Sequence, residues 1–321
     1  MNAVLIIFAV ITALFLICFG IGYVFVCLLI KRQEIIRSPE TGGSSSSLLE
    51  PTGDALWAYN IPTFKPFRAL PFESVEIQSF DKTRLHADFL RGEPGTKVTI
   101  IFCHGYKSEP AFDFAAMYEF YRGLGYNLVY LHMRAHGKSG GKYIGFGALD
   151  RFDVQLWSEK IAELFPGTSI FLHGMSMGAA SILQSAELEL DPAVCGIIAD
   201  CGFSSTNEVF RNLIGGMYHL PATPFVDIFC AVNRIVAGYG FTDADSVKSM
   251  EHSRLPLAYI CGDKDRYVPL DMAMRIYNAC VQDKTLLIAK GAGHAASFMV
   301  ENEKYKSLII DFINKHRKED E

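Results

Sequence analysis

The sequence predicts an α/β fold, with a mostly parallel sheet of eight strands and helices on both faces. From residue 73 onward, short runs rich in Val, Ile, Leu and Phe alternate with longer segments of helical periodicity. Most of the short runs are almost continuously apolar, which is typical of strands that are covered on both faces. We therefore expect parallel strands joined by helical crossovers.

The first two predicted strands, 74–80 and 85–91, are joined by a turn-like segment and form an antiparallel hairpin. The other six predicted strands are apolar runs at 98–103, 127–133, 169–173, 194–200, 256–261 and 285–289. Helices are predicted between them at 113–124, 149–165, 177–188, 270–280 and 296–315.

One gap between predicted strands is longer than the others. Between residues 200 and 255 the pattern shows no strand, but segments 209–217, 225–238 and 244–250 have helical character. Pro221 and Pro224 interrupt them. This region, about 203–252, is either a small helical insertion that covers a pocket or a long crossover, and the pattern leaves both open.

A long apolar segment precedes the predicted domain. Residues 3–30 contain no charged side chain, and a helix of that length reaches about 42 Å, more than the roughly 30 Å hydrocarbon core of a bilayer. The run is too long for the apolar part of a signal peptide, and no cleavage-like sequence follows, so we predict a retained membrane anchor at 1–30 rather than a signal peptide or a core helix. Lys31, Arg32 and Arg37 follow the span, which predicts a cytoplasmic catalytic domain.

The next segment, 31–72, is predicted to be a juxtamembrane region and linker. Pro39, Gly42, Gly43 and a run of four serines at 44–47 are typical of a flexible tether. We place the folded domain at 73–321.

The composition indicates a folded domain, argues against a nucleic-acid partner and gives no sign of disulfide bonds. With 50% hydrophobic and 20% charged residues among 321, the chain can bury a large core. Thirty basic against 35 acidic residues provide no positive excess for a nucleic acid. The eight cysteines form no CxxC pair and are predicted to be free thiols.

The strongest local motif is Gly174-Met175-Ser176-Met177-Gly178, between an apolar strand and an Ala-rich helix. A serine on so tight a turn needs very small residues two positions away on each side, and both are glycine. The turn raises the hydroxyl above the sheet and points helix N–H groups toward an oxyanion formed there. We predict Ser176 as a nucleophile.

A serine hydroxyl needs a base, and the base needs a carboxylate that fixes its tautomer. Candidates follow the last two strands, where active sites of open α/β sheets form: Asp263 and Asp265 after the seventh, and His294 after the eighth. The acid precedes the histidine, as this topology requires. Asp200, at the end of the sixth strand, is a further carboxylate within reach.

From residue 73 onward the chain resembles the α/β-hydrolase superfamily. Four motifs in the correct order carry the resemblance: His104-Gly105-Tyr106, Arg134-Ala135-His136-Gly137-Lys138-Ser139, the serine turn, and the loops of Asp265 and His294. More narrowly, it resembles single-pass, membrane-anchored bacterial hydrolases related to cephalosporin-C deacetylase and other serine esterases.

The resemblance implies roles for individual residues. Asp265 fills the aspartate of the family pattern G-x-x-D-x-x-V-P, with Asp263 as the fallback and Asp200 structural. The oxyanion hole is implied to be the backbone N–H groups of Tyr106 and Met177. Many relatives have an aspartate at the end of the fourth strand, where this chain has His132.

Rival motifs fail on spacing. Gly137-Lys138-Ser139 resembles the end of a phosphate-binding loop, but the required glycine five positions earlier is His132. Two G-x-G segments, at 145–147 and 238–240, lack the third glycine of a dinucleotide fingerprint. His132 and His136 have ligand-like spacing but no HExxH pattern, so we predict structural histidines and no metal site.

The sequence therefore predicts a membrane-anchored serine hydrolase that cleaves carboxylic ester or thioester bonds without a cofactor. Anchoring next to a bilayer favours lipid-like or acylated substrates, and a small acetyl ester remains equally compatible. The open alternatives are a serine peptidase or acyltransferase with the same triad, and a catalytically silent membrane scaffold. An aspartate nucleophile, as in haloalkane dehalogenases, is excluded by Ser176.

Overall fold

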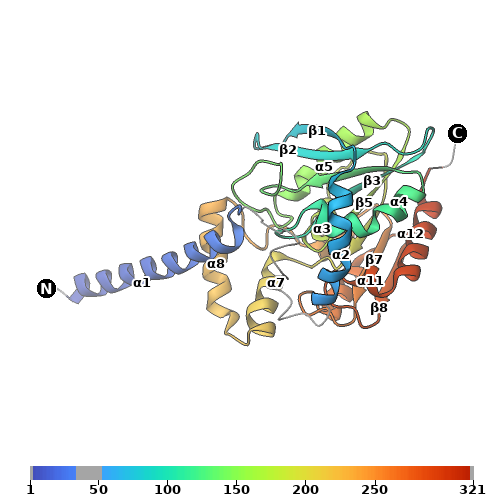
Figure 1. The fold of residues 1–321 in the computed structure, drawn as a ribbon. Coiled ribbons are helices and arrows are strands. Elements are labelled where there is room, and N and C mark those ends of the chain that lie inside the picture. Colours follow the sequence, from blue (N-terminus) through green and yellow to red (C-terminus); the bar gives the residue numbers. More distant parts are fainter. Residues whose placement is uncertain (1–2, 34–52, 319–321) are drawn as a thin grey trace.

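A computed structural model describes residues 3–33 and 53–318, so most of the predicted linker lies outside the described residues. Its centre is an eight-stranded sheet in the order β1-β2-β4-β3-β5-β6-β7-β8 (Figure 1). The strands are β1 (Glu73–Gln78), β2 (Arg84–Leu90), β3 (Val98–Cys103), β4 (Asn127–His132), β5 (Ser169–Met175), β6 (Val194–Asp200), β7 (Leu257–Gly262) and β8 (Lys284–Ala289). The pairs β1–β2 and β2–β4 are antiparallel and the others are parallel, as predicted.

Helices cover both faces of the sheet. Those on one face are α5 (Asp150–Leu164), α6 (Met177–Ser185) and α10 (Leu270–Ala279). Those on the other are α2 (Gly53–Arg68), α3 (Pro110–Phe114), α4 (Tyr118–Gly123) and α12 (Asn302–His316), with α11 (Ser297–Val300) before the last. Two separate clusters of buried apolar side chains, one on each face, form the core.

Two helical regions differ from the sequence prediction. The helix expected at 113–124 is broken into α3, a 3-10 turn at Ala115–Met117, and α4. Helix α2 was not predicted, because Pro62 and Pro66 lie inside it and proline normally ends a helix. Its Phe64 and Phe67 are almost fully buried against the sheet, so tertiary packing outweighs the local preference.

The segment between β6 and β7 contains α7 (Thr206–Arg211), a π-helical turn at Asn212–Met217, α8 (Ala222–Ala237) and α9 (Ser246–His252). The two parts of this region pack differently, and that it covers a pocket stays a prediction. Helix α9 packs against α6 and α10 and takes the place of a crossover helix, whereas α7 and α8 pack on each other, with α8 also against the N-terminal helix.

The N-terminal helix α1 (Ala3–Phe25) continues into a π-helical turn at Val26–Ile30. By length and composition this 28-residue helix can cross a membrane, with a mean hydropathy of 3.1 in its most apolar window. Its last turn is part of the domain, since Val26 and Ile30 are 0% exposed in the main core. The folded core therefore includes residues that lie before residue 73.

Candidate active site

Ser176 lies at the sharp turn between β5 and α6. Its backbone has φ 52° and ψ −111°, a sparsely populated conformation for a residue with a side chain. A Cβ atom on Gly174 would lie 2.5 Å from backbone atoms of Ala179, and one on Gly178 would lie 1.9 Å from the carbonyl oxygen of Cys103. Neither position can accept a larger residue without moving the backbone, which is the steric reason for the G-x-S-x-G pattern.

The structure brings Ser176, His294 and Asp265 together from three separate loops. His294 Nε2 lies 2.8 Å from Ser176 Oγ, and His294 Nδ1 lies 2.8 Å from Asp265 Oδ2. The other carboxylate oxygen of Asp265 accepts backbone N–H bonds from Tyr267 and Val268, at 2.9 and 2.8 Å. Because Nδ1–H donates to the carboxylate, Nε2 is left to accept the serine proton.

The surroundings of these groups favour a positive imidazole. The side chain of His294 is 18% exposed and that of Asp265 is 0% exposed. Burial lowers the pKa of His294, but the charge of Asp265 and its hydrogen bond raise it, and the net pKa lies well above the usual value. The carboxylate thus stabilises the imidazolium that proton transfer from Ser176 would form.

Two backbone segments border Ser176 and could stabilise an oxyanion. The loop after β3 approaches closely, since a Cβ on Gly105 would lie 3.5 Å from the Cβ of Ser176. Gly105 N–H donates to Asp113 Oδ2 at 2.6 Å, which fixes the loop immediately before Tyr106. Met177 is the first residue of α6, where backbone N–H groups have no acceptor within the helix. The residue before Tyr106 and the first residue of α6 therefore lie next to Ser176.

The structure separates the two aspartates after β7. Asp263 Oδ1 accepts from Gly291 N–H at 2.7 Å and so ties together the loops after β7 and β8. Asp265, not Asp263, hydrogen-bonds His294. Asp200 is fully buried at the end of β6, and burial raises the pKa of its carboxyl to about 7.

Cys201 is a site neighbour that sequence reasoning missed. Its sulfur, a His294 nitrogen and an Asp265 oxygen lie within 4.8 Å of one another. Burial raises the pKa of the Cys201 thiol to about 12, so it is neutral near pH 7. The sequence did offer an indication of this: Cys201 comes directly after Asp200 at the end of β6. It therefore lies at the same edge of the sheet as the loops of Asp265 and His294.

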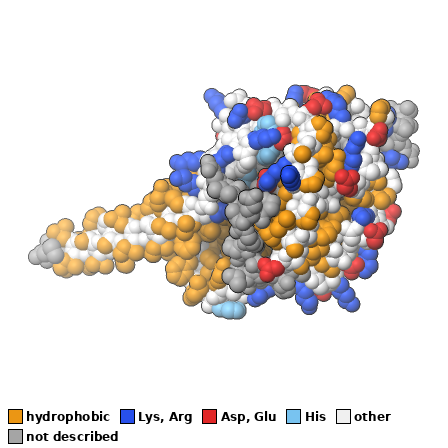
Figure 2. Space-filling view, in the orientation of Figure 1, with side chains coloured by type: hydrophobic (Ala, Val, Ile, Leu, Met, Phe, Trp, Pro, Cys, Tyr) orange, Lys and Arg blue, Asp and Glu red, His pale blue; other side chains and the backbone are white. Residues whose placement is uncertain are grey.

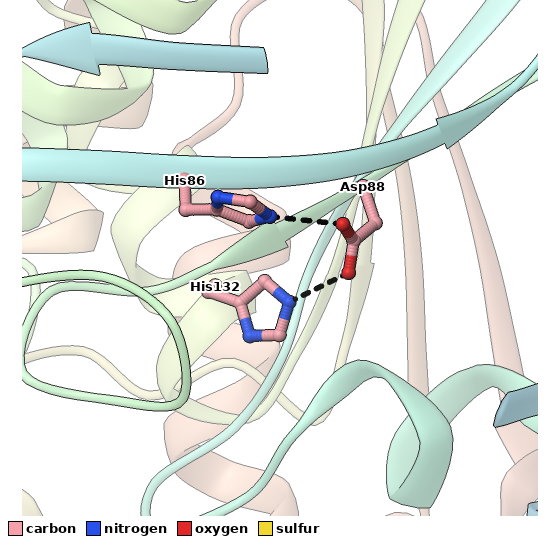
Figure 3. Close-up of side chains that lie close together, drawn as sticks. All are labelled: His86, Asp88 and His132. Carbon is pink, nitrogen blue, oxygen red and sulfur yellow. Dashed lines mark hydrogen bonds and ion pairs between the residues drawn. The ribbon is translucent and has the colours of Figure 1, made fainter. Parts of the chain in front are cut away.

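A second cluster, formed by His86, Asp88 and His132 on β2 and β4, explains the departure at His132 (Figure 3). His86 Nε2 and His132 Nε2 donate to different oxygens of Asp88, at 2.9 and 3.0 Å. Lys138 Nζ lies 2.6 and 2.9 Å from the same two oxygens. Burial opposes ionisation, but these hydrogen bonds hold the pKa of Asp88 well below its usual range. The ammonium group already takes the place of a bound cation at this carboxylate.

His136, by contrast, supports the loop beside the serine. Its Nε2 accepts from the Lys107 backbone N–H at 3.0 Å, and its Nδ1 lies 2.8 Å from the carbonyl oxygen of Arg134. His132 and His136 thus have separate hydrogen-bond partners.

Arg134 forms a buried ion pair that the sequence analysis did not predict. Its Nη2 and Nε atoms donate to the two oxygens of Asp153 at 2.7 and 2.9 Å, and Nη2 also donates to Ser79 Oγ at 2.7 Å. Because Asp153 lies in the first turn of α5, this pair joins the 134–139 loop to that helix.

Comparisons with known proteins agree with this architecture. The family model described as "Serine aminopeptidase, S33" matches residues 94–215. The uncharacterized protein YqkD of Bacillus subtilis is 27% identical over 224 residues, covering 68% of this chain and 72% of that protein. The uncharacterized membrane protein YNL320W of Saccharomyces cerevisiae is 21% identical over 247 residues, covering 77% and 81%.

Solved structures share the fold. The Pyrococcus furiosus esterase Pf2001 superposes with a TM-score of 0.64 at 21% identity, covering 90% of this chain and 98% of that chain. The predicted fold is therefore confirmed: the chain has the α/β-hydrolase fold with one N-terminal apolar helix. The family match also supports a hydrolase.

Proposed function

We propose that this chain is a membrane-anchored serine hydrolase that cleaves carboxylic ester or thioester bonds through an acyl-enzyme. The observation that carries the proposal is the pair of 2.8 Å contacts joining Ser176 to His294 and His294 to Asp265. A serine hydroxyl is a weak nucleophile near neutral pH, and an oriented base supplies the activation that acyl transfer needs.

In the proposed reaction, Ser176 Oγ attacks the acyl carbon while His294 Nε2 takes the hydroxyl proton. The carbonyl oxygen becomes an oxyanion, to which the N–H groups of Tyr106 and Met177 donate. His294 then gives its proton to the leaving alcohol or thiol, and the acyl group stays on Ser176. A water molecule gives a proton to His294 and attacks the acyl-enzyme, and His294 returns that proton to Ser176 Oγ as the carboxylic acid leaves. Throughout, Asp265 holds the imidazole in one tautomer.

The choice of ester over amide has support from the Pyrococcus furiosus esterase Pf2001, which has the same fold. The family description favours a second candidate, a serine peptidase, because it names an aminopeptidase. Both would use the same residues, so substrate assays must distinguish them. An acyltransferase would differ only in the acceptor that resolves the acyl-enzyme.

Membrane anchoring has two supports. Helix α1 is apolar and largely exposed, and one relative with 21% identity is described as a membrane protein. Lys31 and Arg32 follow the apolar run, which favours a cytoplasmic catalytic domain. The third basic residue of the prediction, Arg37, lies outside the described residues.

The nucleophile can be tested with a fluorophosphonate probe on the full-length protein in detergent micelles. We expect wild type to be labelled, Ser176→Ala to lose all labelling and His294→Ala to lose most of it. Ser307→Ala is a matched control, because Ser307 lies on α12 with a 3.3 Å contact to Asp311. A folded wild type that takes no label would overturn the proposal and favour a silent scaffold.

The reaction class can be tested on the same preparations. Hydrolysis of p-nitrophenyl esters of increasing chain length is compared with hydrolysis of aminoacyl p-nitroanilides. We expect kcat/KM to be at least tenfold higher for the preferred ester, and the chain-length profile gives the size of the acyl site. Faster cleavage of the anilides would favour the peptidase.

A further inference from the structure

The apolar N-terminal helix is fixed to the catalytic domain. Val26 and Ile30 are fully buried in the core of the domain. Immediately after them, Ile144 N–H donates to the Ile30 carbonyl oxygen, and Arg32 N–H donates to the Lys142 carbonyl oxygen, both at 2.8 Å. The direction of α1 relative to the sheet is therefore set by packing and backbone hydrogen bonds.

The residue at which α1 first contacts the domain indicates where a membrane surface would lie along the helix. Residues 3–21 are exposed except for the half-buried Cys18 and Phe19, and as a helix they span about 28 Å, close to the roughly 30 Å hydrocarbon thickness. Packing begins at the half-buried Phe19 and is tight at Gly22, where an added Cβ would lie 2.6 Å from Val232 of α8. If α1 spans a bilayer, the membrane surface lies where α8 crosses it.

Helix α8 runs crosswise to α1 at this level (Figure 1). Ile228 and Val232 face Gly22, and Phe225 and Ile235 lie on the same stripe of α8 beyond the contact. Four large apolar side chains of this region are exposed, by 52, 59, 42 and 68% respectively: Tyr218, Leu220, Phe225 and Ile235. Figure 2 shows hydrophobic side chains gathered over α8 at the base of α1.

Basic side chains follow the end of the apolar helix, nine residues after Gly22. Lys31 is exposed and Arg32 is half-buried directly after the π-helical turn. Lys31 forms a β-bridge with Tyr143, next to the exposed Lys142. Figure 2 shows Lys and Arg side chains beside the base of α1. Anionic lipid headgroups attract cations on this side of the span.

We propose that the exposed apolar residues of α8, Phe225 and Ile235, form a bilayer-contact face together with the basic residues around Lys31. In this arrangement α8 lies in the headgroup region, parallel to the membrane. An exposed apolar stripe on an amphipathic helix is what such a position requires. This inference rests on the anchoring part of the proposed function.

The contact face is joined to the candidate active site. Aromatic rings connect in series from Tyr106 to Phe146, Phe210 and Phe229, with centroids 5.0, 5.4 and 5.1 Å apart, and Phe229 lies 5.8 Å from Phe25 of α1. The loop beside Ser176 is thus held close to the membrane surface. The substrate class that fits this position is an acyl ester located in the lipid interface.

The face can be tested with the full-length protein in nanodiscs made with brominated phosphatidylcholine, which quenches nearby tryptophan. The two native tryptophans, Trp57 and Trp157, are buried and provide a common background. We would introduce Phe225→Trp and Ile235→Trp on α8, Phe15→Trp within α1, and Val281→Trp as an exposed control before β8.

Lipid brominated on the acyl chain near the headgroup should quench the added α8 tryptophans at least twofold more than the tryptophan of Val281→Trp. Lipid brominated near the ends of the acyl chains should quench the tryptophan of Phe15→Trp. If the tryptophan of Phe15→Trp is quenched but the α8 tryptophans are quenched no more than that of Val281→Trp, the contact face is wrong and anchoring still holds. If Phe15→Trp is not quenched either, both anchoring and the contact face are wrong. The fluorophosphonate result is independent of both outcomes.

Discussion

The phenol of Tyr106 donates a hydrogen bond of 2.8 Å to the carbonyl oxygen of Leu29. The neighbouring Lys107 donates through Nζ to the carbonyl oxygen of Leu28, also at 2.8 Å. Carbonyl groups at the end of a helix lack partners within it, and these two side chains satisfy a pair of them. The end of the apolar helix therefore holds the loop that carries a proposed oxyanion donor.

Loss of the Tyr106 hydroxyl should slow the reaction without weakening substrate binding. Tyr106→Phe keeps the ring and the backbone N–H but removes the bond to Leu29, a net contribution of about 1 kcal/mol. We expect kcat to fall roughly threefold to tenfold with KM nearly unchanged, because the N–H position matters most in the transition state. Steady-state ester hydrolysis measures this. Tyr59→Phe, at an exposed position on α2, is the control, and an unchanged kcat for Tyr106→Phe would show that the bond does not position the loop.

The last turn of the apolar helix should contribute to the stability of the domain. Ile30→Ala empties a fully buried position and should cost about 2–4 kcal/mol in the free energy of unfolding. Leu28 is 55% exposed on the same turn, so Leu28→Ala should cost less than about 1 kcal/mol. Urea unfolding in a fixed detergent compares the two. Equal, small effects would mean that the helix is only a tether.

The activity of the enzyme should fall as the pH decreases through the pKa of His294, because only the neutral imidazole can accept the serine proton. Asp265 raises this pKa, so the acidic limb of kcat/KM should lie above the usual histidine value. Asp265→Asn should move that limb to lower pH and reduce kcat by a factor on the order of 10⁴. A pH–rate profile tests both effects. Asp263→Asn should leave the limb in place, and a shift of equal size there would assign the acid to Asp263.

Removal of Arg134 should destabilise the fold, because it leaves the Asp153 carboxylate buried without its partner. We expect Arg134→Met to cost about 3–5 kcal/mol of unfolding free energy. The double variant Arg134→Met, Asp153→Leu should recover much of this loss. Arg84→Met, which removes an exposed pair with Glu76, should cost at most about 1 kcal/mol. Chemical denaturation measures all three, and a double variant no more stable than Arg134→Met would contradict the buried-pair explanation.

The eight strands and the serine turn could be predicted from the amino-acid pattern alone. All eight strands lie within two residues of their predicted bounds, because a parallel strand covered on both faces must be almost entirely apolar. The serine turn was equally predictable, because a side chain at Gly174 or Gly178, two residues from Ser176, would clash with nearby backbone atoms. Chain order also placed Asp265 and His294 at the correct edge of the sheet.

The contacts between residues far apart in the chain became visible only in the folded structure. It showed that α2 forms in spite of its prolines, that Cys201 lies beside His294, and that His132 shares Asp88 with His86. It also showed that Val26 and Ile30, which read as membrane anchor, belong to the core. The physical reason is the same in each case. Periodicity and motif spacing report interactions between residues a few positions apart, whereas burial and hydrogen bonding here depend on segments that are brought together only by folding.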